Sequence, residues 1–155
     1  MKLNIGCGPD TKQGWTNVDR YVTENVCMVA DVQALPFKDG AFSEVAALDL
    51  VEHVSWRKTR NVLRELARVL SPDGEAEIRV PDIDALIELR NGPRMNDREF
   101  LRRIFGDQGH PGDFHHAGFT GEILEEELVK VGLKVVERWV KNGNTTTRCR
   151  PAASP

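Results

Sequence analysis

LNIGCG, residues 3–8, joins a short apolar run to two glycines that flank a cysteine. The apolar run predicts a buried strand, and the glycines predict a turn where no side chain separates the backbone from a ligand. Backbone N–H groups beyond such a turn can hold a carboxylate or a phosphate. The triplet alone fits a tight structural turn equally well, so its meaning depends on the residues that follow.

Acidic residues follow at the ends of the next two predicted strands. Residues 16–18 and 26–30 are predicted strands that end at Asp19 and Asp31. A carboxylate at the first position can accept both hydroxyls of a ribose, and one at the second can reach an adenine amine. Because ligands of open α/β sheets bind beyond the carboxyl ends of strands, both acids are expected beside the glycines. Each acid alone also fits a strand-end turn or a helix cap.

Apolar runs alternate with amphipathic segments along the chain, which predicts an α/β fold with a mostly parallel sheet and helices on both faces. A tight turn is expected at 71–74, a loop at 106–118, a single domain at 1–150 and a disordered tail at 151–155. The expected strands are 3–5, 16–18, 26–30, 45–48, 75–80, 133–140 and 145–149, and the expected helices are 56–70, 82–89, 97–105 and 121–131.

Composition fits an ordinary domain of 155 residues with 40% hydrophobic and 29% charged residues. A chain of this size can bury a sufficient core without disulfides or a structural metal. The net charge of -3 provides no basic field for nucleic acid or a membrane surface. Three scattered cysteines without a CxxC pair, and no apolar run typical of a signal peptide or a membrane span, predict a cytoplasmic protein.

The chain resembles the class I S-adenosylmethionine-dependent methyltransferases in four stretches, LNIGCGPDTKQGWTNVDR, ADVQALPFKDGAFSEV, LDLVEHV and LRELARVLSPDGEAEIRVPD. The nearest resemblance is to small predicted methyltransferases with the same Gly-Cys-Gly opening. It covers residues 2–82 well and residues 115–140 loosely. The resemblance implies a Rossmann-like fold of seven strands with the last antiparallel, and S-adenosylmethionine as the cofactor, with S-adenosylhomocysteine as its product.

The same resemblance implies where the cofactor binds. Its contacts would be Gly6, Cys7 and Gly8 along the methionine part, Asp19 at the ribose, Asp31 and Val32 at the adenine, and Leu48 and Asp49 at the methionine amino end.

Two departures from the family pattern change this expectation. Asn4 stands where family members usually carry an acid, so weaker or rearranged cofactor binding is expected. Residues 7–16 alone connect the first two strands, whereas a parallel crossover usually takes a dozen residues or more. The first helix is therefore expected to shrink to about one turn, which leaves the cofactor less covered unless another segment closes over it.

Histidines are the candidate catalytic residues. His53 follows the fourth strand near the expected methyl group, where it can act as a general base, orient the cofactor or, with Glu52, fix the next helix. His115 and His116 belong to a polar loop that we interpret as a lid with groups that bind the acceptor or accept its proton. We name His53, His115 and His116 as catalytic candidates.

The loop also contains His110 and the acids Asp107 and Asp113. Imidazoles and carboxylates suit transition metals, but this spacing matches no metal signature and a third ligand would have to come from elsewhere. No metal site is therefore expected.

The function expected from these observations is methyl transfer to a small-molecule or glycan acceptor, without nucleic-acid or membrane partners. One alternative is a non-catalytic module or partner subunit that binds S-adenosylmethionine or S-adenosylhomocysteine. A nicotinamide-dependent oxidoreductase fits less well, because Thr11 stands where its third glycine would be. A nucleic-acid methyltransferase has only the basic stretch 98–103 and two arginines near the end of the chain in its favour.

Overall fold

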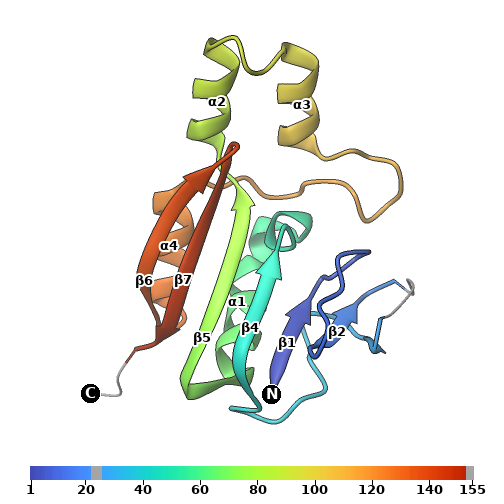
Figure 1. The fold of residues 1–155 in the computed structure, drawn as a ribbon, viewed down its shortest axis with the longest axis vertical. Helices are drawn as coiled ribbons and strands as arrows, with labels where there is room; N and C mark the ends of the chain where they lie inside the picture. Colours follow the sequence, from blue (N-terminus) through green and yellow to red (C-terminus); the bar gives the residue numbers. More distant parts are fainter. Residues whose placement is uncertain (22–25, 153–155) are drawn as a thin grey trace.

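A seven-stranded sheet in the order β3-β2-β1-β4-β5-β7-β6 forms the body of this computed structural model, which describes residues 1–21 and 26–152 (Figure 1). All neighbours from β3 to β5 pair in parallel, and β7 runs antiparallel to both β5 and β6. The predicted α/β fold with a mostly parallel sheet is confirmed. The strands are β1 (Lys2–Ile5), β2 (Thr16–Asp19), β3 (Met28–Val29), β4 (Phe42–Leu48), β5 (Leu70–Pro81), β6 (Leu133–Lys141) and β7 (Asn144–Pro151).

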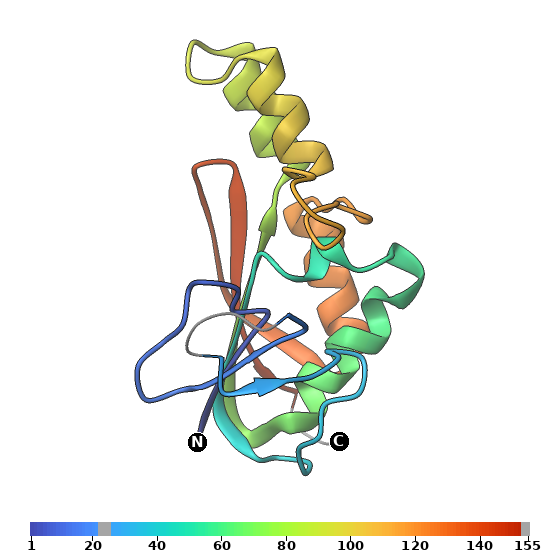
Figure 2. The same cartoon turned by 90° about the vertical axis from the view of Figure 1, so that its right-hand side faces the viewer.

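The helices are the 3-10 helix η1 (Val51–His53), α1 (Trp56–Val69), α2 (Ile83–Asn91), α3 (Asp97–Phe105) and α4 (Gly121–Lys130). Figure 2 shows α1 and α4 on the same face of the sheet. The paired helices α2 and α3 project past one end of the sheet, and we call them the helical arm (Figure 1). None of the helices in the described part of the chain is long and apolar enough to cross a membrane.

On the opposite face of the sheet, residues 1–21 and 26–152 provide no helical cover, although helices were expected on both faces. Residues 6–15 contain no helix and form a loop instead (Figure 2). The crossover is too short for a helix and two connections, and Pro9 with two nearby glycines disfavours helical geometry. The expectation of about one helical turn here is thus corrected to none.

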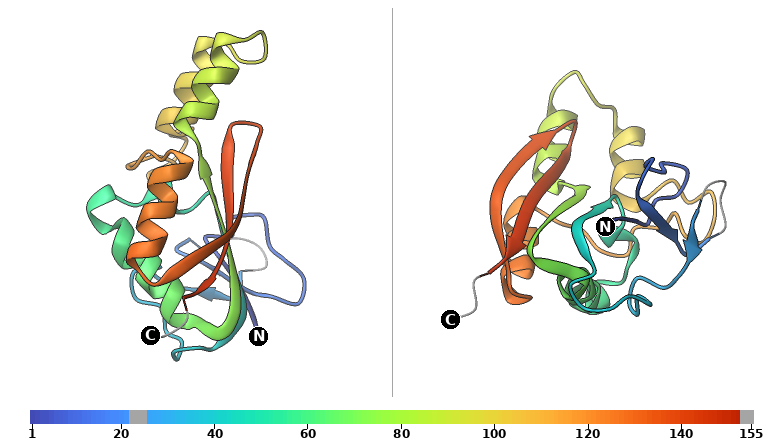
Figure 3. Two further views of the ribbon diagram at one scale, coloured as in Figure 1. Left: turned by 90° about the vertical axis from the view of Figure 1, so that its left-hand side faces the viewer. Right: turned by 60° about the horizontal axis from the view of Figure 1, so that its bottom comes forward.

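The pattern of β5 matches this one-sided cover. Ala76, Ile78 and Val80 are fully buried, and they alternate with polar side chains that are only partly buried. On the polar face, Arg148 of β7 forms ion pairs with Glu75 and Glu137 at 3.0 and 2.6 Å. Since successive side chains of a strand point to opposite faces, one face packs into the core and the other is charged. The left view of Figure 3 shows α1 and α4 together on one side of the sheet.

The core forms between that apolar face and the two helices that cover it. The helical spacing of five apolar residues predicts a buried stripe over 56–70, and all five are buried. Four of them are fully buried in α1, and the fifth, Leu70, begins β5 instead of ending the helix. The four are Val62, Leu63, Leu66 and Val69. From α4, Leu124 and Leu128 complete the layer.

Two predictions about the ends of β5 and β7 are corrected. Residues 71–74, expected as a tight turn, belong to β5 and bulge out of its pairing with β4, between the pairs Phe42–Leu70 and Glu44–Glu75. Strand β7 continues to Pro151, which pairs with Leu133 at the start of β6, so residue 151 is not part of a tail. Residues 153–155 of the predicted disordered tail lie outside the described residues.

One ion pair joins the two helices that cover the sheet. Arg60 of α1 binds Glu127 of α4 through two hydrogen bonds of 3.0 Å, and Lys130 adds a third contact at 2.8 Å. Hydrogen bonds from both cations lower the pKa of the Glu127 carboxyl to about 2. The ionised carboxylate is therefore favoured in the folded state over the unfolded state.

We expect Glu127→Gln to lower the free energy of unfolding by about 1 kcal/mol at pH 7, the upper range for a partly exposed pair. Because the folded pKa lies below the unfolded value of 4.5, this contribution is present above pH 4.5 and is lost as the pH falls toward 2. Urea unfolding of the parent protein and of the Glu127→Gln variant between pH 7 and pH 3 measures the difference between their free energies of unfolding. This difference should become smaller as the pH falls. The exposed neighbour Glu126 provides the control, since Glu126→Gln should change stability little; a constant difference at all pH values would contradict this assignment.

Candidate active site

The edge of the sheet at the carboxyl ends of β1, β2, β4 and β5, which we call the rim, contains the glycine loop. Backbone N–H groups of Gly6 and Cys7 donate to the carbonyl of Val18 at 2.8 and 3.3 Å, which ties the loop to β2. Gly6 and Gly8 have φ values of +63° and +47°, a region that favours glycine. The Cys7 side chain is buried beneath them, and burial raises the pKa of its thiol.

The two glycines serve different purposes. A Cβ at Gly6 would lie 2.6 Å from a methyl group of Leu50, so this glycine allows close packing of the protein on itself. Among the described residues, a Cβ at Gly8 would meet no atom within 4 Å. Within residues 1–21 and 26–152, the opening that was expected beside the loop therefore lies at Gly8.

Asp19, at the end of β2, lies directly beside that opening. Its carboxylate accepts hydrogen bonds from the N–H groups of Gly8 and Tyr21, both at 2.8 Å. Each carboxylate oxygen has two acceptor sites, so Asp19 braces the loop and keeps capacity for a ligand hydroxyl. Asp31 is exposed further along the rim, and Val32 packs against the core next to it.

Asn4 has a structural task that the sequence analysis missed. Its side chain is buried and donates to the Asp10 carbonyl at 3.0 Å and to the Asn17 side-chain oxygen at 2.9 Å. The same oxygen of Asn17 accepts from the backbone of Lys12. Asn4 thus shapes the loop that replaces the first helix, and its amide hydrogens are not available to a ligand at the rim.

Asp49, expected at the methionine end of the cofactor, is bound by Arg79 of β5. The Arg79 Nε donates to Oδ1 at 2.9 Å, and the other guanidinium nitrogen Nη2 contacts Oδ2. These bonds raise the pKa of the arginine, so the Asp49 charge is already compensated. Arg79 was not among the site residues predicted from the sequence. It pairs with the half-buried Leu48 across β4 and β5, and this register places it beside Asp49.

The turn after β4 holds a second group of polar residues. Helix η1 carries Glu52 and His53, and the Nδ1 of His53 lies 3.2 Å from the Phe114 carbonyl. The N–H groups of His116 and Ala117 both donate to the Glu52 carbonyl, at 2.8 and 3.1 Å. These contacts hold residues 114–117 against η1, although His53 and Phe114 are 61 residues apart in sequence.

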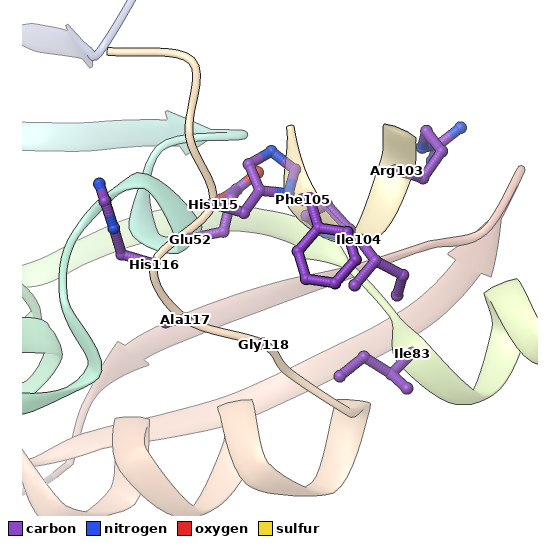
Figure 4. A pocket seen from close by; sticks show the side chains of 10 residues that line it. Glu52, Ile83, Arg103, Ile104, Phe105, His115, His116, Ala117 and Gly118 are labelled. Carbon is purple, nitrogen blue, oxygen red and sulfur yellow. The ribbon is translucent and has the colours of Figure 1, made fainter. Parts of the chain in front are cut away.

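That attachment brings together two of the three catalytic candidates. The rings of His53 and His115 meet edge to face, with centroids 4.8 Å apart. In Figure 4 the side chains of Glu52 and His115 lie on one side of the loop, and His116 extends from the other side. His116 stacks on Phe114 instead, with centroids 6.3 Å apart.

Burial controls the charges in this group. Only 2% of Glu52 is exposed, and neither carboxylate oxygen accepts a hydrogen bond from the described residues. Burial raises the pKa of the Glu52 carboxyl to about 8. Burial also lowers the pKa of His53 and His115, so both imidazoles are neutral at pH 7.

Two adjoining cavities of about 220 and 300 Å³ lie between this group and the helical arm, and Figure 4 shows the side chains that line the smaller one. Glu52, Pro81, Arg103 and His115 line both of them. His53 and Asp49 line the larger, whereas His116 lines the smaller. Their combined size suits a small molecule that enters from the rim.

The loop of residues 106–118 crosses the rim from the helical arm to the end of β2 (Figure 1). At its far point, His110 contacts the ring of Tyr21, with centroids 5.5 Å apart, and pairs with Asp113 at 2.8 Å. His110 and Asp113 thus stabilise the loop tip. A segment does lie over the otherwise open rim, as the sequence analysis required for a covered cofactor.

Residues 8–78 match a protein family described as a methyltransferase domain. No protein of curated function is significantly similar to the chain in sequence. The match begins at Gly8, so the narrower resemblance to proteins with the Gly-Cys-Gly opening stays a prediction.

Solved structures share the fold. The PH0226 protein of Pyrococcus horikoshii is 21% identical with a TM-score of 0.66, over 97% of this chain and 81% of that one. A SAM-dependent methyltransferase of Methanosarcina mazei is 16% identical with a TM-score of 0.69, over 99% and 92%. The 1,6-didemethyltoxoflavin-N1-methyltransferase of Burkholderia thailandensis, solved with S-adenosylhomocysteine bound, is 16% identical with a TM-score of 0.66, over 98% and 71%.

The buried amide of Asn4 makes a testable prediction about the glycine loop. Asn4→Asp, which restores the acid usual in the family, places a carboxylate against the acceptor oxygens of Asp10 and Asn17. We expect the free energy of unfolding to fall by about 2 kcal/mol, because a buried group loses its partners. Urea unfolding followed by tryptophan fluorescence measures the change.

The matched control is Asn61→Asp on the exposed face of α1, where the side chain accepts from Arg64 and an acid serves equally well. Equal stability of the Asn4→Asp and Asn61→Asp proteins would show that Asn4 does not organise the loop.

Proposed function

We propose that this chain is a class I S-adenosylmethionine-dependent methyltransferase that transfers a methyl group to a small-molecule or glycan acceptor. The resemblance predicted from the sequence is confirmed by the matched residues 8–78 and by the shared fold. The acceptor class, a cytoplasmic location and the roles of individual residues are proposals.

One observation carries the proposal, namely the arrangement of Gly8, Asp19 and Asp31 along the rim. Asp19 accepts from the Gly8 N–H at 2.8 Å and keeps acceptor capacity for a ligand beside the glycine loop. Asp31 continues the same edge with an exposed carboxylate. These features fit a nucleoside whose ribose meets Asp19 and whose adenine meets Asp31 and Val32.

The remaining cofactor contacts follow from the same arrangement. Gly6, Cys7 and Gly8 would line the methionine part, where the backbone can approach a ligand closely. Leu48 and Asp49 would face its amino end. Arg79 already compensates Asp49, so we assign Asp49 a shared role in which Arg79 orients its carboxylate.

When bound, S-adenosylmethionine supplies a methyl group on a sulfonium, and such a transfer depends on alignment and exclusion of water. The cavities beside η1 would hold the acceptor, with the loop of residues 106–118 as their cover. Neutral imidazoles of His53 and His115 can accept a proton from an acceptor hydroxyl there. His116, which lines the smaller cavity, would contact the acceptor without sharing in this cluster.

Calorimetric titration with S-adenosylmethionine and S-adenosylhomocysteine tests the cofactor site. We expect micromolar binding of both, about −8 kcal/mol. Asp31→Ala and Asp19→Asn should each weaken it at least tenfold, because a ligand hydroxyl or amine loses its acceptor. Asp31→Ala is the cleaner variant, since Asp19 also braces the loop.

Asp73→Asn is the matched control, because Asp73 lies at the start of β5, far from the rim. A folded protein that binds neither ligand would overturn the proposed function. Binding that both Asp31→Ala and Asp19→Asn leave unchanged would place the cofactor elsewhere.

A further inference from the structure

Glu52 is the buried acid that the cofactor site leaves unexplained. Both its oxygens are inaccessible and neither accepts a hydrogen bond from the described residues, although buried carboxyl groups nearly always have partners. The nearest positive side chains are committed elsewhere. Arg79 binds Asp49, and Arg103 binds the Asn142 carbonyl and the Asn144 side chain.

Two histidines direct nitrogen atoms toward the same space. One carboxylate oxygen of Glu52 and one ring nitrogen each of His53 and His115 lie within 4.8 Å of one another. Two ligands of a tetrahedral zinc ion, at about 2.1 Å from it, lie about 3.4 Å apart. Side-chain rotations that move these atoms by about 1 Å would therefore bring them into one coordination sphere.

The contact between His53 and the Phe114 carbonyl suits a metal-binding histidine. A carbonyl oxygen can only accept, so the contact with Phe114 places the proton of His53 on Nδ1 and leaves the Nε2 lone pair free. Metal-binding histidines commonly donate their other ring N–H to a backbone carbonyl in this way.

The position of His115 is fixed by the backbone on both sides. Its own N–H donates to the Phe105 carbonyl at 3.1 Å, and the next two residues bind the Glu52 carbonyl. The three candidate ligands are thus held by the contacts that attach the loop to η1, with no metal required to assemble them.

We propose that Glu52, His53 and His115 form a binding site for one divalent transition-metal ion, of which zinc is the probe we would use first. Two imidazoles and one carboxylate form a ligand set suited to zinc or iron, and a poor one for magnesium, which prefers oxygen ligands. The ion would supply the partner that the Glu52 carboxylate lacks. All three ligands line the larger cavity, so a remaining coordination position of the ion would be open to a small molecule in that cavity.

This inference reaches beyond the proposed function, because binding of the ion does not depend on methyl transfer. It also refines that proposal. A bound ion would occupy the lone pairs of His53 and His115, so these imidazoles would hold the ion instead of accepting a proton. The ion would polarise the acceptor hydroxyl, and the proton of that hydroxyl would pass to water. The cofactor contacts at Gly8, Asp19 and Asp31 belong to a separate part of the rim and stay as proposed.

The test measures metal binding by the full chain after removal of metals with a chelator. All metal-binding measurements use the Cys27→Ser protein as the parent, because the exposed Cys27 thiol can itself bind zinc. We expect calorimetry to show one equivalent of Zn²⁺ and no comparable binding of Mg²⁺. Co²⁺ should give the visible absorption of a four- or five-coordinate site without a thiolate charge-transfer band.

Three variants remove one ligand each, namely Glu52→Gln, His53→Gln and His115→Gln. Each should weaken Zn²⁺ binding at least tenfold and abolish the rise in melting temperature that Zn²⁺ gives the parent protein. Glu52→Gln keeps the shape of the side chain, so it tests the ligand even if a histidine variant folds poorly. His110→Ala is the matched control, a histidine of the same loop that pairs with Asp113 away from the cluster, and it should bind as the parent does.

Zinc binding that Glu52→Gln leaves unchanged, or no binding of Zn²⁺ and Co²⁺ by the folded parent, would overturn the site. Titration with S-adenosylhomocysteine, run on the same chelator-treated protein, separates this result from the proposed function. Cofactor binding without metal binding rejects only the metal site, and metal binding without cofactor binding rejects only the methyltransferase proposal.

Discussion

Two backbone N–H groups, those of His116 and Ala117, donate to one carbonyl, that of Glu52, and the candidate site depends on this attachment. It joins the turn after β4 to a loop from the second half of the chain. The contact between His53 and the Phe114 carbonyl strengthens the same junction. Without it, the loop of residues 106–118 would have no fixed position over the rim, and the two histidines would not meet.

The one-sided cover of the sheet explains why that loop matters. A parallel sheet is normally buried on both faces, but here α1 and α4 share one face and residues 6–15 form a loop on the rim. Charged side chains of β5, β6 and β7 pair with one another on the open face, which makes its exposure tolerable. Cover for a ligand at the rim must then come from elsewhere, and the loop from the helical arm lies in that place.

The residues of the site have more than one duty, and this limits how each can be changed. Asp19 braces Gly8 while it faces the opening, so a variant at this position disturbs both loop and ligand. Asn4, which a family pattern would treat as a defect in cofactor binding, instead holds the short crossover in shape. Asp49 and Arg79 similarly compensate each other before any ligand arrives.

The sequence by itself determined the order of strands and helices, the glycine loop and the acids at the strand ends. The reason is that hydrophobic periodicity and the backbone preferences of glycine and other turn residues act over a few residues. It also placed His53 directly after β4. Only the tertiary structure decided that Glu52 is buried without a partner, that His115 joins it while His116 turns away, and that Arg79 compensates Asp49. These properties depend on burial and on contacts between segments far apart in the chain, which no local pattern encodes.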